Sequence, residues 1–182
     1  TYFIPFLNKI YMLPATAVGM YGIVNQYGLK MIGGPVGGFM SDKVHKSAAK
    51  HIRVGFVVCI VAMAVFLMIP HEALGQKGMW MLGAVCTLTF GAIVFTMRAV
   101  FFAPMDEVKV PREITGAAMS MASLIIYLPN TFAYVMYGNF LDRFPGMTGF
   151  RIVFSVMIGW AVVGVGVSTF LIRRIKKHQK NA

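Results

Sequence analysis

The sequence predicts an all-α membrane protein, a polytopic bundle of five full transmembrane helices and the end of a sixth. Three observations predict it: 58% of the 182 residues are hydrophobic, only 13% are charged, and apolar stretches run without charge for the length of a membrane span. A soluble domain usually holds about 45–50% apolar and about 25% charged residues. The composition therefore excludes an ordinary soluble enzyme and a disordered tail.

The expected spans follow one another with short polar loops between them. A helix needs about 20 predominantly apolar residues to cross the hydrocarbon core of a bilayer. The apolar runs are continuous and do not alternate with polar residues, which favours helices over barrel strands. Spans are expected at 17–42, 52–70, 79–104, 114–141 and 152–172, after a partial span at about 1–12 and before a basic tail at 173–182.

Basic residues gather in the loops of one side of this arrangement. The positive-inside rule places that side, with the C-terminus, in the cytoplasm, as expected for a bacterial inner membrane protein. The net charge of +11 is then mainly a topology signal with some attraction to anionic lipid, and we expect no nucleic-acid partner. The residues of this side are Lys43, Lys46, Lys50, Arg53, Arg98, Lys109, Arg112, Arg173, Arg174, Lys176, Lys177 and Lys180.

Lys30 is the most informative charged residue. It precedes Asp42, at the expected end of its span, by about 18 Å of helix, which places it near the bilayer centre. A Lys there costs about 2.5–3.5 kcal/mol, so it should face a wet cavity or a carboxylate. Gln26 and Tyr27 share its helix face and are expected to line the same cavity. The alternative is a misplaced span, with Lys30 at the interface and Tyr27 in packing.

The span at 114–141 carries one polar face on an otherwise apolar helix. Its polar residues are spaced by three and four positions and fall within an arc of about 100°. We expect Tyr127 and Asn130 to line a cavity, whereas hydrogen bonding between helices is the alternative. Pro129 predicts a kink at this depth. The polar face consists of Ser120, Ser123, Tyr127, Asn130, Tyr134 and Tyr137, the last expected at the membrane interface.

The other spans differ in polarity. The spans at 52–70 and 152–172 have few polar side chains and are expected to be outer, lipid-facing helices. Arg98 lies about 9 Å of helix before Pro104. It is either part of a site or an anchor that reaches the cytoplasmic interface.

Small residues near the end of the first full span predict close helix packing. They form two overlapping small-xxx-small patterns, which let helix backbones approach one another. A sliding or rocking contact would use the same residues. The patterns are Gly33 with Gly37 and Gly34 with Gly38.

Asp42 ends the same span at the negative end of the helix dipole and therefore needs a positive partner. Lys43, Lys46 or the N-terminus of a neighbouring helix would serve, and a solvated loop Asp is the alternative.

The segment 37–46 resembles a cytoplasmic loop motif of the major facilitator superfamily, Gly-x-x-x-Asp-Arg/Lys-x-Gly-Arg/Lys. His45 replaces the second glycine of that motif. The segments 115–118, 127–129 and 138–142 resemble the eleventh helix of sugar-phosphate and organic-anion branches of the superfamily. In some relatives the residue after the proline is Asp, whereas Asn130 here cannot carry a proton. The matching residues of the loop motif are Gly38, Asp42, Lys43 and Lys46.

This resemblance implies the C-terminal half of a twelve-helix transporter, from the end of helix seven to helix twelve. It implies that Asp42 helps to lock the cytoplasmic side against helix eleven in the outward-open state. The chain starts at Thr1 within apolar sequence, so we expect a fragment whose N-terminal half is missing. The resemblance also implies a coupling ion, H⁺ or Na⁺.

The function expected from these residues is secondary active transport of a small polar, anionic solute by alternating access. Lys30 and Arg98 would supply positive charge in a low-dielectric cavity. Gln26, Tyr27, Tyr127, Asn130 and Tyr134 would supply hydrogen bonds and stacking. The alternatives left open are an efflux pump for drug-like compounds and a non-transporting membrane subunit.

An enzyme is not expected. The spans contain no paired carboxylates and no nucleophile motif, and the spacing of His45, His51, His71 and His178 does not match a zinc site. We therefore expect no cofactor and no metal.

Overall fold

The computed structural model describes residues 15–68, 76–108, 110–144 and 146–181. The partial span expected at about 1–12 lies outside these residues. All regular structure within the described ranges is helical, and η denotes a segment of π-helix. The elements are α2 (Ala15–Ile23), η1 (Val24–Gly28), α3 (Leu29–Phe39), η2 (Met40–His45), α4 (Ala48–Met68), α5 (Gln76–Ala99), α6 (Pro104–Glu107), α7 (Arg112–Arg143) and α8 (Met147–Asn181).

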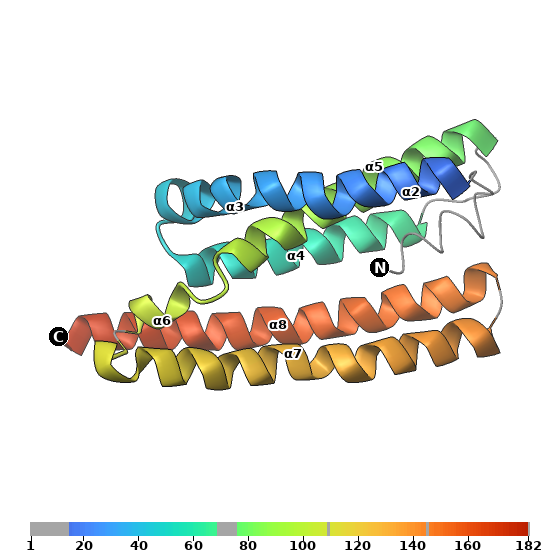
Figure 1. The fold of residues 1–182 in the computed structure, drawn as a ribbon. Coiled ribbons are helices and arrows are strands. Elements are labelled where there is room, and N and C mark those ends of the chain that lie inside the picture. Colours follow the sequence, from blue (N-terminus) through green and yellow to red (C-terminus); the bar gives the residue numbers. More distant parts are fainter. Residues whose placement is uncertain (1–14, 69–75, 109, 145, 182) are drawn as a thin grey trace.

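The long helices lie lengthwise beside one another (Figure 1). α3 packs on α5, α5 on α4, α4 on α8, and α8 on α7, so α3 and α7 stand at the two ends of this row. The helices of the spans at 52–70 and 152–172, which are expected to be outer and lipid-facing, lie inside this row among the described residues, although most of their apolar windows stay unburied. These helices, α4 and α8, each have packed neighbours on two sides, whereas no residue in the most apolar stretch of α7 is buried.

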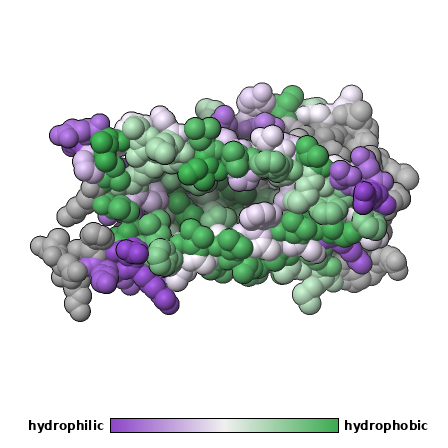
Figure 2. Space-filling view, turned by 90° about the horizontal axis from the view of Figure 1, so that it is seen from below, coloured by the Kyte–Doolittle hydropathy of each residue, from purple (hydrophilic) through white to green (hydrophobic). Residues whose placement is uncertain are grey.

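Three described helices are long and apolar enough to cross a membrane. They are Ala48–Met68, Arg112–Arg143 and Thr148–Lys177. In α5 the described apolar run is the shorter Val85–Ala99. The all-helical class is thus confirmed for the described residues, but of the five full spans expected, length and composition support three among them. Hydrophobic side chains cover most of the middle of the face in Figure 2, and the most hydrophilic ones lie mainly toward its ends.

The segment expected as one span at 17–42 consists of four consecutive helical pieces. The π-helical segments η1 and η2 interrupt the α-helical pattern, because a π turn closes its hydrogen bond over five residues and takes up one extra residue. The chain leaves this helical stretch at Lys46, whose φ of 52° lies in the left-handed region. This turn follows directly after His45, the residue that replaces the second glycine of the loop motif.

The inner face of α3 packs very closely on α5. A Cβ at Gly33 would lie 2.8 Å from the Cβ of Phe95, and a Cβ at Gly37 would overlap the carbonyl oxygen of Thr96. Only glycine allows this approach, because α5 presents its backbone to these two positions. The pattern of Gly33 and Gly37 is therefore used for helix packing.

The same inner face continues back through η1. Asn25 and Leu29 both lie against Gly91 of α5, where a Cβ would meet their side chains. Residues spaced by four drift by about 40° per step around a regular α-helix. The extra residue of η1 reduces this drift, so the inner face stays on α5 from Asn25 to Gly37.

The second small-residue pattern does not take part in packing. A Cβ added at Gly34 or Gly38 would meet nothing within 4 Å among the described residues. The two overlapping patterns thus separate into one that packs on α5 and one on an open face.

Aromatic side chains hold the centre of the row. Phe66 of α4 meets Phe154 of α8 edge to face, with ring centroids 5.6 Å apart, and Phe150 joins the same buried cluster. The hydroxyl groups of Tyr21 in α2 and Thr87 in α5 share a hydrogen bond beside it. Tyr137, expected at the membrane interface, is buried against its neighbours with 8% exposure.

We predict that Gly37→Ala lowers the free energy of unfolding by about 1–3 kcal/mol, because the new methyl group cannot fit against the α5 backbone. Thermal unfolding of the detergent-purified protein measures the effect. Gly38→Ala is the matched control. Its methyl group meets nothing and alanine favours a helix by about 1 kcal/mol, so stability should be unchanged or raised. Equal losses in the two variants would contradict the packing described here.

Candidate functional site

The structure gathers Gln26, Tyr27 and Lys30 on the exposed side of α3 and η1. All three side chains are exposed, and Tyr27 retains 70% of its accessible surface. Gln26 and Tyr27 lie within η1, and Lys30 follows it by two residues. Single π turns inside helices occur frequently at functional sites. The shared face expected for these three residues is therefore present, and an irregular turn that the sequence did not indicate lies within it.

No described pocket adjoins Lys30. One pocket is a small apolar space of about 20 Å³ between α4, α5 and α8, lined by residues such as Phe66 and Cys86. A second pocket opens at the end of the bundle near Asp42. The residues that line these two pockets do not form the cavity that was expected around Lys30. The Lys30 side chain is exposed.

The serines of the α7 polar face satisfy their hydroxyl groups within their own helix. Ser120 donates to the carbonyl of Gly116 at 3.0 Å, and Ser123 donates to the carbonyl of Met119 at 2.8 Å. Serine and threonine commonly bond the carbonyl four residues back in this way. These two residues therefore need neither water nor a second helix as a hydrogen-bond acceptor.

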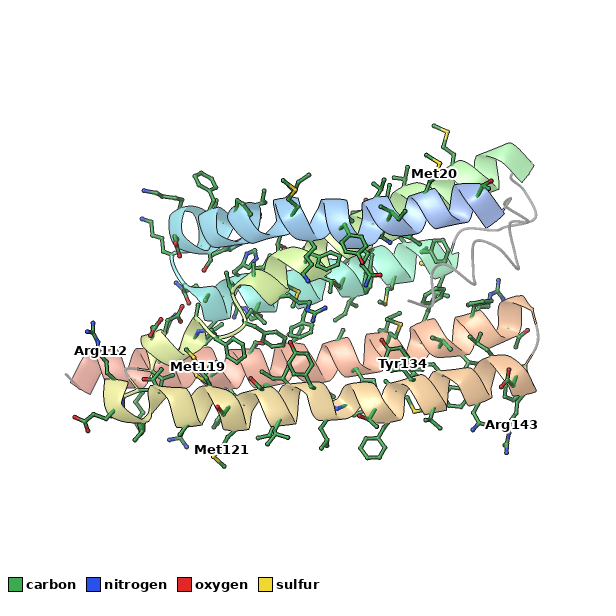
Figure 3. The ribbon with its side chains drawn as sticks, viewed as in Figure 1. Met20, Arg112, Met119, Met121, Tyr134 and Arg143 are labelled. Carbon is green, nitrogen blue, oxygen red and sulfur yellow. The ribbon has the colours of Figure 1, made fainter. Side chains whose placement is uncertain are left out.

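The tyrosines of the same face are half exposed. Tyr127 and Tyr134 each retain 52% of their accessible surface. In Figure 3, Met121 points away from the other helices, and Tyr134 lies on the opposite side of α7. The backbone of Asn130 continues the helix, but its side chain lies outside the described part of the structure. α3 and α7 share no appreciable packing interface, so the described residues do not bring Lys30 together with the tyrosines.

Arg98 lies in the last turn of α5, which ends at Ala99 and not at Pro104 as expected. Its side chain is exposed, and a cation is favourable at the negative end of a helix dipole. Gly37 packs beside Ala99, so Arg98 lies roughly 10 Å further along the bundle than Lys30. This position fits the anchor interpretation of Arg98 better than a shared site with Lys30.

A cluster that the sequence did not reveal joins the loop after α5 to the start of α4. The carboxylate of Glu107 in α6 accepts a hydrogen bond from the Ser47 hydroxyl at 2.9 Å and another from the backbone N–H of Ala48. The Ser47 oxygen also accepts from the N–H of Lys50 at 3.3 Å. Serine before a helix is a recognised N-cap signal, but the distant carboxylate could not be read from the local sequence.

The loop motif residues surround an open pocket of about 390 Å³ at the same end. Asp42, Lys43 and Lys46 are exposed, and Gly38 is partly exposed. The N-terminus of a neighbouring helix was one of the partners considered for Asp42, and Glu107 occupies that of α4. Asp42 shares its pocket with α4 and α6 and not with α7, the helix it was expected to lock. The pocket is lined by Ser41, Asp42, Lys46, Ser47, Ala48, Ala103, Asp106 and Glu107.

Two histidines meet beside this pocket. The Nδ1 atoms of His45 and His51 lie 3.2 Å apart, so one must carry the proton and the other must accept it. His45 Nδ1 is also 3.2 Å from the carbonyl oxygen of Met40. His51 was expected in a loop but lies in the first turn of α4 with 3% exposure. Within the described residues, no group of three or more possible metal ligands comes together.

Comparisons with known proteins identify relatives in bacterial inner membranes. Inner membrane protein YihN of Escherichia coli (strain K12) is 49% identical over 180 residues, which cover 99% of this chain and 42% of the relative. Inner membrane protein YqcE of the same strain is 26% identical over 170 residues, covering 92% of this chain and 38% of the relative. The chain therefore spans about two fifths of the length of these curated relatives. No solved structure matches the chain.

The resemblance to the major facilitator superfamily is corrected by these findings. No family model matches the chain, and the two relatives are described only as inner membrane proteins. Short motifs with a substituted glycine were too weak to establish the family. Together with the three apolar helices, the relatives support an integral protein of the bacterial inner membrane.

We predict that Glu107→Gln lowers the free energy of unfolding by about 0.5–2 kcal/mol, because a neutral amide is a weaker acceptor at a helix N-terminus. Chemical or thermal unfolding in detergent measures the loss. Asp106→Asn removes the same charge from the adjacent, exposed residue and should have little effect. If both variants lose the same stability, the loss reflects charge alone and not the hydrogen bonds to α4.

Proposed function

We propose that this chain is part of an inner membrane protein that moves a small polar, anionic solute across the bilayer by alternating access. The single observation that carries the proposal is Lys30. It lies halfway along the helical stretch from Ala15 to His45, exposed beside Gln26 and Tyr27 on the side away from α5. A charge at that depth is costly unless it serves a solute, a polar cavity or a partner.

The chemistry of this face favours an anion. An ammonium group attracts negative charge strongly where the surroundings have a low dielectric constant. The Gln26 amide and the Tyr27 phenol can each donate a hydrogen bond to a phosphate or carboxylate oxygen. The attraction of an anion bound to all three groups would also offset part of the desolvation cost of the isolated ammonium.

The α7 face provides a second set of polar groups in this proposal. Tyr127 and Tyr134 are each 52% exposed, and a solute or further protein could contact this exposed surface. The relatives YihN and YqcE are more than twice as long as this chain. We propose that the remaining part of a full-length protein of that size completes the cavity between these faces, with Asn130 as a further donor. Whether H⁺ or Na⁺ drives the movement is left to transport measurements.

The proposal includes five membrane crossings. The stretch from Ala15 to His45 would extend about 45 Å as a helix, enough to cross despite its π turns. α5 would supply the other crossing beyond the three helices named above. The basic loops and the C-terminus would lie in the cytoplasm, because Lys and Arg are enriched there.

A non-transporting membrane protein is the second candidate, and specific observations favour it. Neither described pocket adjoins Lys30, and Ser120 and Ser123 are satisfied inside α7. The names of the relatives YihN and YqcE describe a location and no activity. This candidate accounts for the comparisons at least as well as transport does.

We predict that sugar phosphates or small carboxylates raise the melting temperature of the full-length protein, and that Lys30→Ala abolishes this shift. A ligand that binds the folded state stabilises it by mass action, so losing the cation removes the effect. A thermal-shift screen with these compounds, followed by uptake into proteoliposomes, measures both properties. Lys30→Arg should keep part of the response. Met31→Ala alters the neighbouring residue, which is 83% exposed, and should keep all of it.

Two outcomes would overturn the proposal. One outcome is a compound that raises the melting temperature and enters proteoliposomes equally well with the unaltered protein and with Lys30→Ala. Lys30 would then not belong to the binding site. No shift and no flux with any of these compounds in the unaltered protein would favour the non-transporting candidate.

A further inference from the structure

The C-terminal end of α8 is a helix that continues from the apolar span into a cluster of cations. Its charge-free stretch from Ile152 to Ile172 extends about 31 Å, close to the thickness of the hydrocarbon core. The helix does not end there but runs on to Asn181. Arg173 and the residues after it are therefore held at the level of the lipid headgroups.

One side of this end is fixed to α4. Ile172 and Ile175, with 7% and 8% exposure, form a buried cluster with Ala49 at the start of α4. Further along, the ring of Phe56 lies against Gly164 of α8. Because these contacts hold one face of α8, the residues on its opposite face have fixed positions and cannot turn toward α4.

The opposite face of α8 is apolar up to Phe170 and basic beyond it, toward the C-terminus. Val163, Val167 and Phe170 are 55%, 63% and 60% exposed. At about 100° per residue they share a face with Arg174 and Lys177, which are also exposed. The Arg174 guanidinium lies 5.3 Å from the centroid of the Phe170 ring, which holds it at the top of the apolar stripe.

The helices that pack on α8 bring little acidic charge to this end, because α4 has none and α7 has Glu113 beside Arg112 in its first turn. Neither α4 nor α8 contains an Asp or Glu, and α4 contributes Lys50 and Arg53 at the same end. The acids of the adjoining pocket are Asp42, Asp106 and Glu107, and Glu107 is already bonded to the N-terminus of α4. Figure 1 shows the loop between α3 and α4, the α6 region and the C-terminus at this one end of the molecule.

We propose that this face of α8 binds an anionic phospholipid, with its phosphate on Arg174 and Lys177 and an acyl chain along Val163, Val167 and Phe170. The occupant is a lipid and not a soluble anion, because the cations lie directly above three exposed apolar side chains that a small anion cannot cover. Basic surfaces at the ends of membrane helices recognise anionic headgroups in this way. The site does not depend on the proposed transport function.

Trp160 provides a local probe of this site. It is 63% exposed and lies one turn before Val163 on the same helix. In the full-length protein, with its other tryptophans replaced by phenylalanine, phospholipids brominated on the acyl chain quench Trp160 when they occupy the site. The experiment compares brominated phosphatidylglycerol with brominated phosphatidylcholine in otherwise identical vesicles. We expect about a fivefold preference for phosphatidylglycerol, which falls as salt is raised.

Two pairs of variants distinguish a specific lipid site on this face from a general attraction of the positively charged helix end for anionic lipid. Arg174→Gln with Lys177→Gln should bring the preference close to one. Arg173→Gln with Lys176→Gln removes the same charge from the same turns but away from the apolar stripe, and it should keep most of the preference. If the first pair prevents folding, its two single variants are measured, each with an intermediate loss.

Three results would overturn the proposal. One is equal quenching by the two lipids in the unaltered protein. Another is an equal loss in both variant pairs, which would indicate a diffuse field. The third is displacement of the brominated lipid by millimolar inorganic phosphate, which would indicate a soluble-anion site.

Discussion

The close contact between α3 and α5 decides which residues of the first described stretch face inward. Gly33 and Gly37 lie against the α5 backbone, and Asn25 and Leu29 continue this face across η1. A helix that commits one side to such a contact must present its other side outward. Gln26, Tyr27 and Lys30 are therefore exposed as a group, and their polarity has to be met by something other than α5.

Much of the fold could be predicted from the sequence, because length and apolarity are properties of continuous segments. The helices α4, α7 and α8 follow directly from runs that are long and apolar enough to cross a bilayer. The π turns could not be predicted, because no residue type specifies them and tertiary packing favours the extra residue. Which of the two glycine pairs, Gly33/Gly37 or Gly34/Gly38, packs on α5 depends on where α5 lies in the fold. The local sequence does not specify that position.

The candidate site was predictable only in part. The grouping of Gln26, Tyr27 and Lys30 follows from helical spacing and was expected. The joint role of Lys30 with the tyrosines of α7 depends on tertiary arrangement, and α3 and α7 lie at opposite ends of the packed row. Glu107 was missed because its partners, Ser47 and Ala48, are about sixty residues away in the chain. Of the partners considered for Asp42, the N-terminus of α4 is bonded by this other carboxylate.

The π-helical segment η1 also has a mechanical consequence. A π-helical turn, with its i→i+5 hydrogen bond, contains one residue more than a turn of the α-helix on either side of it. If η1 converted to a regular α-helical turn, α2 would rotate about its axis by about 100° relative to α3, the angle of one residue. That screw motion would carry the Tyr21 hydroxyl away from Thr87 while the glycine contact of α3 stayed in place.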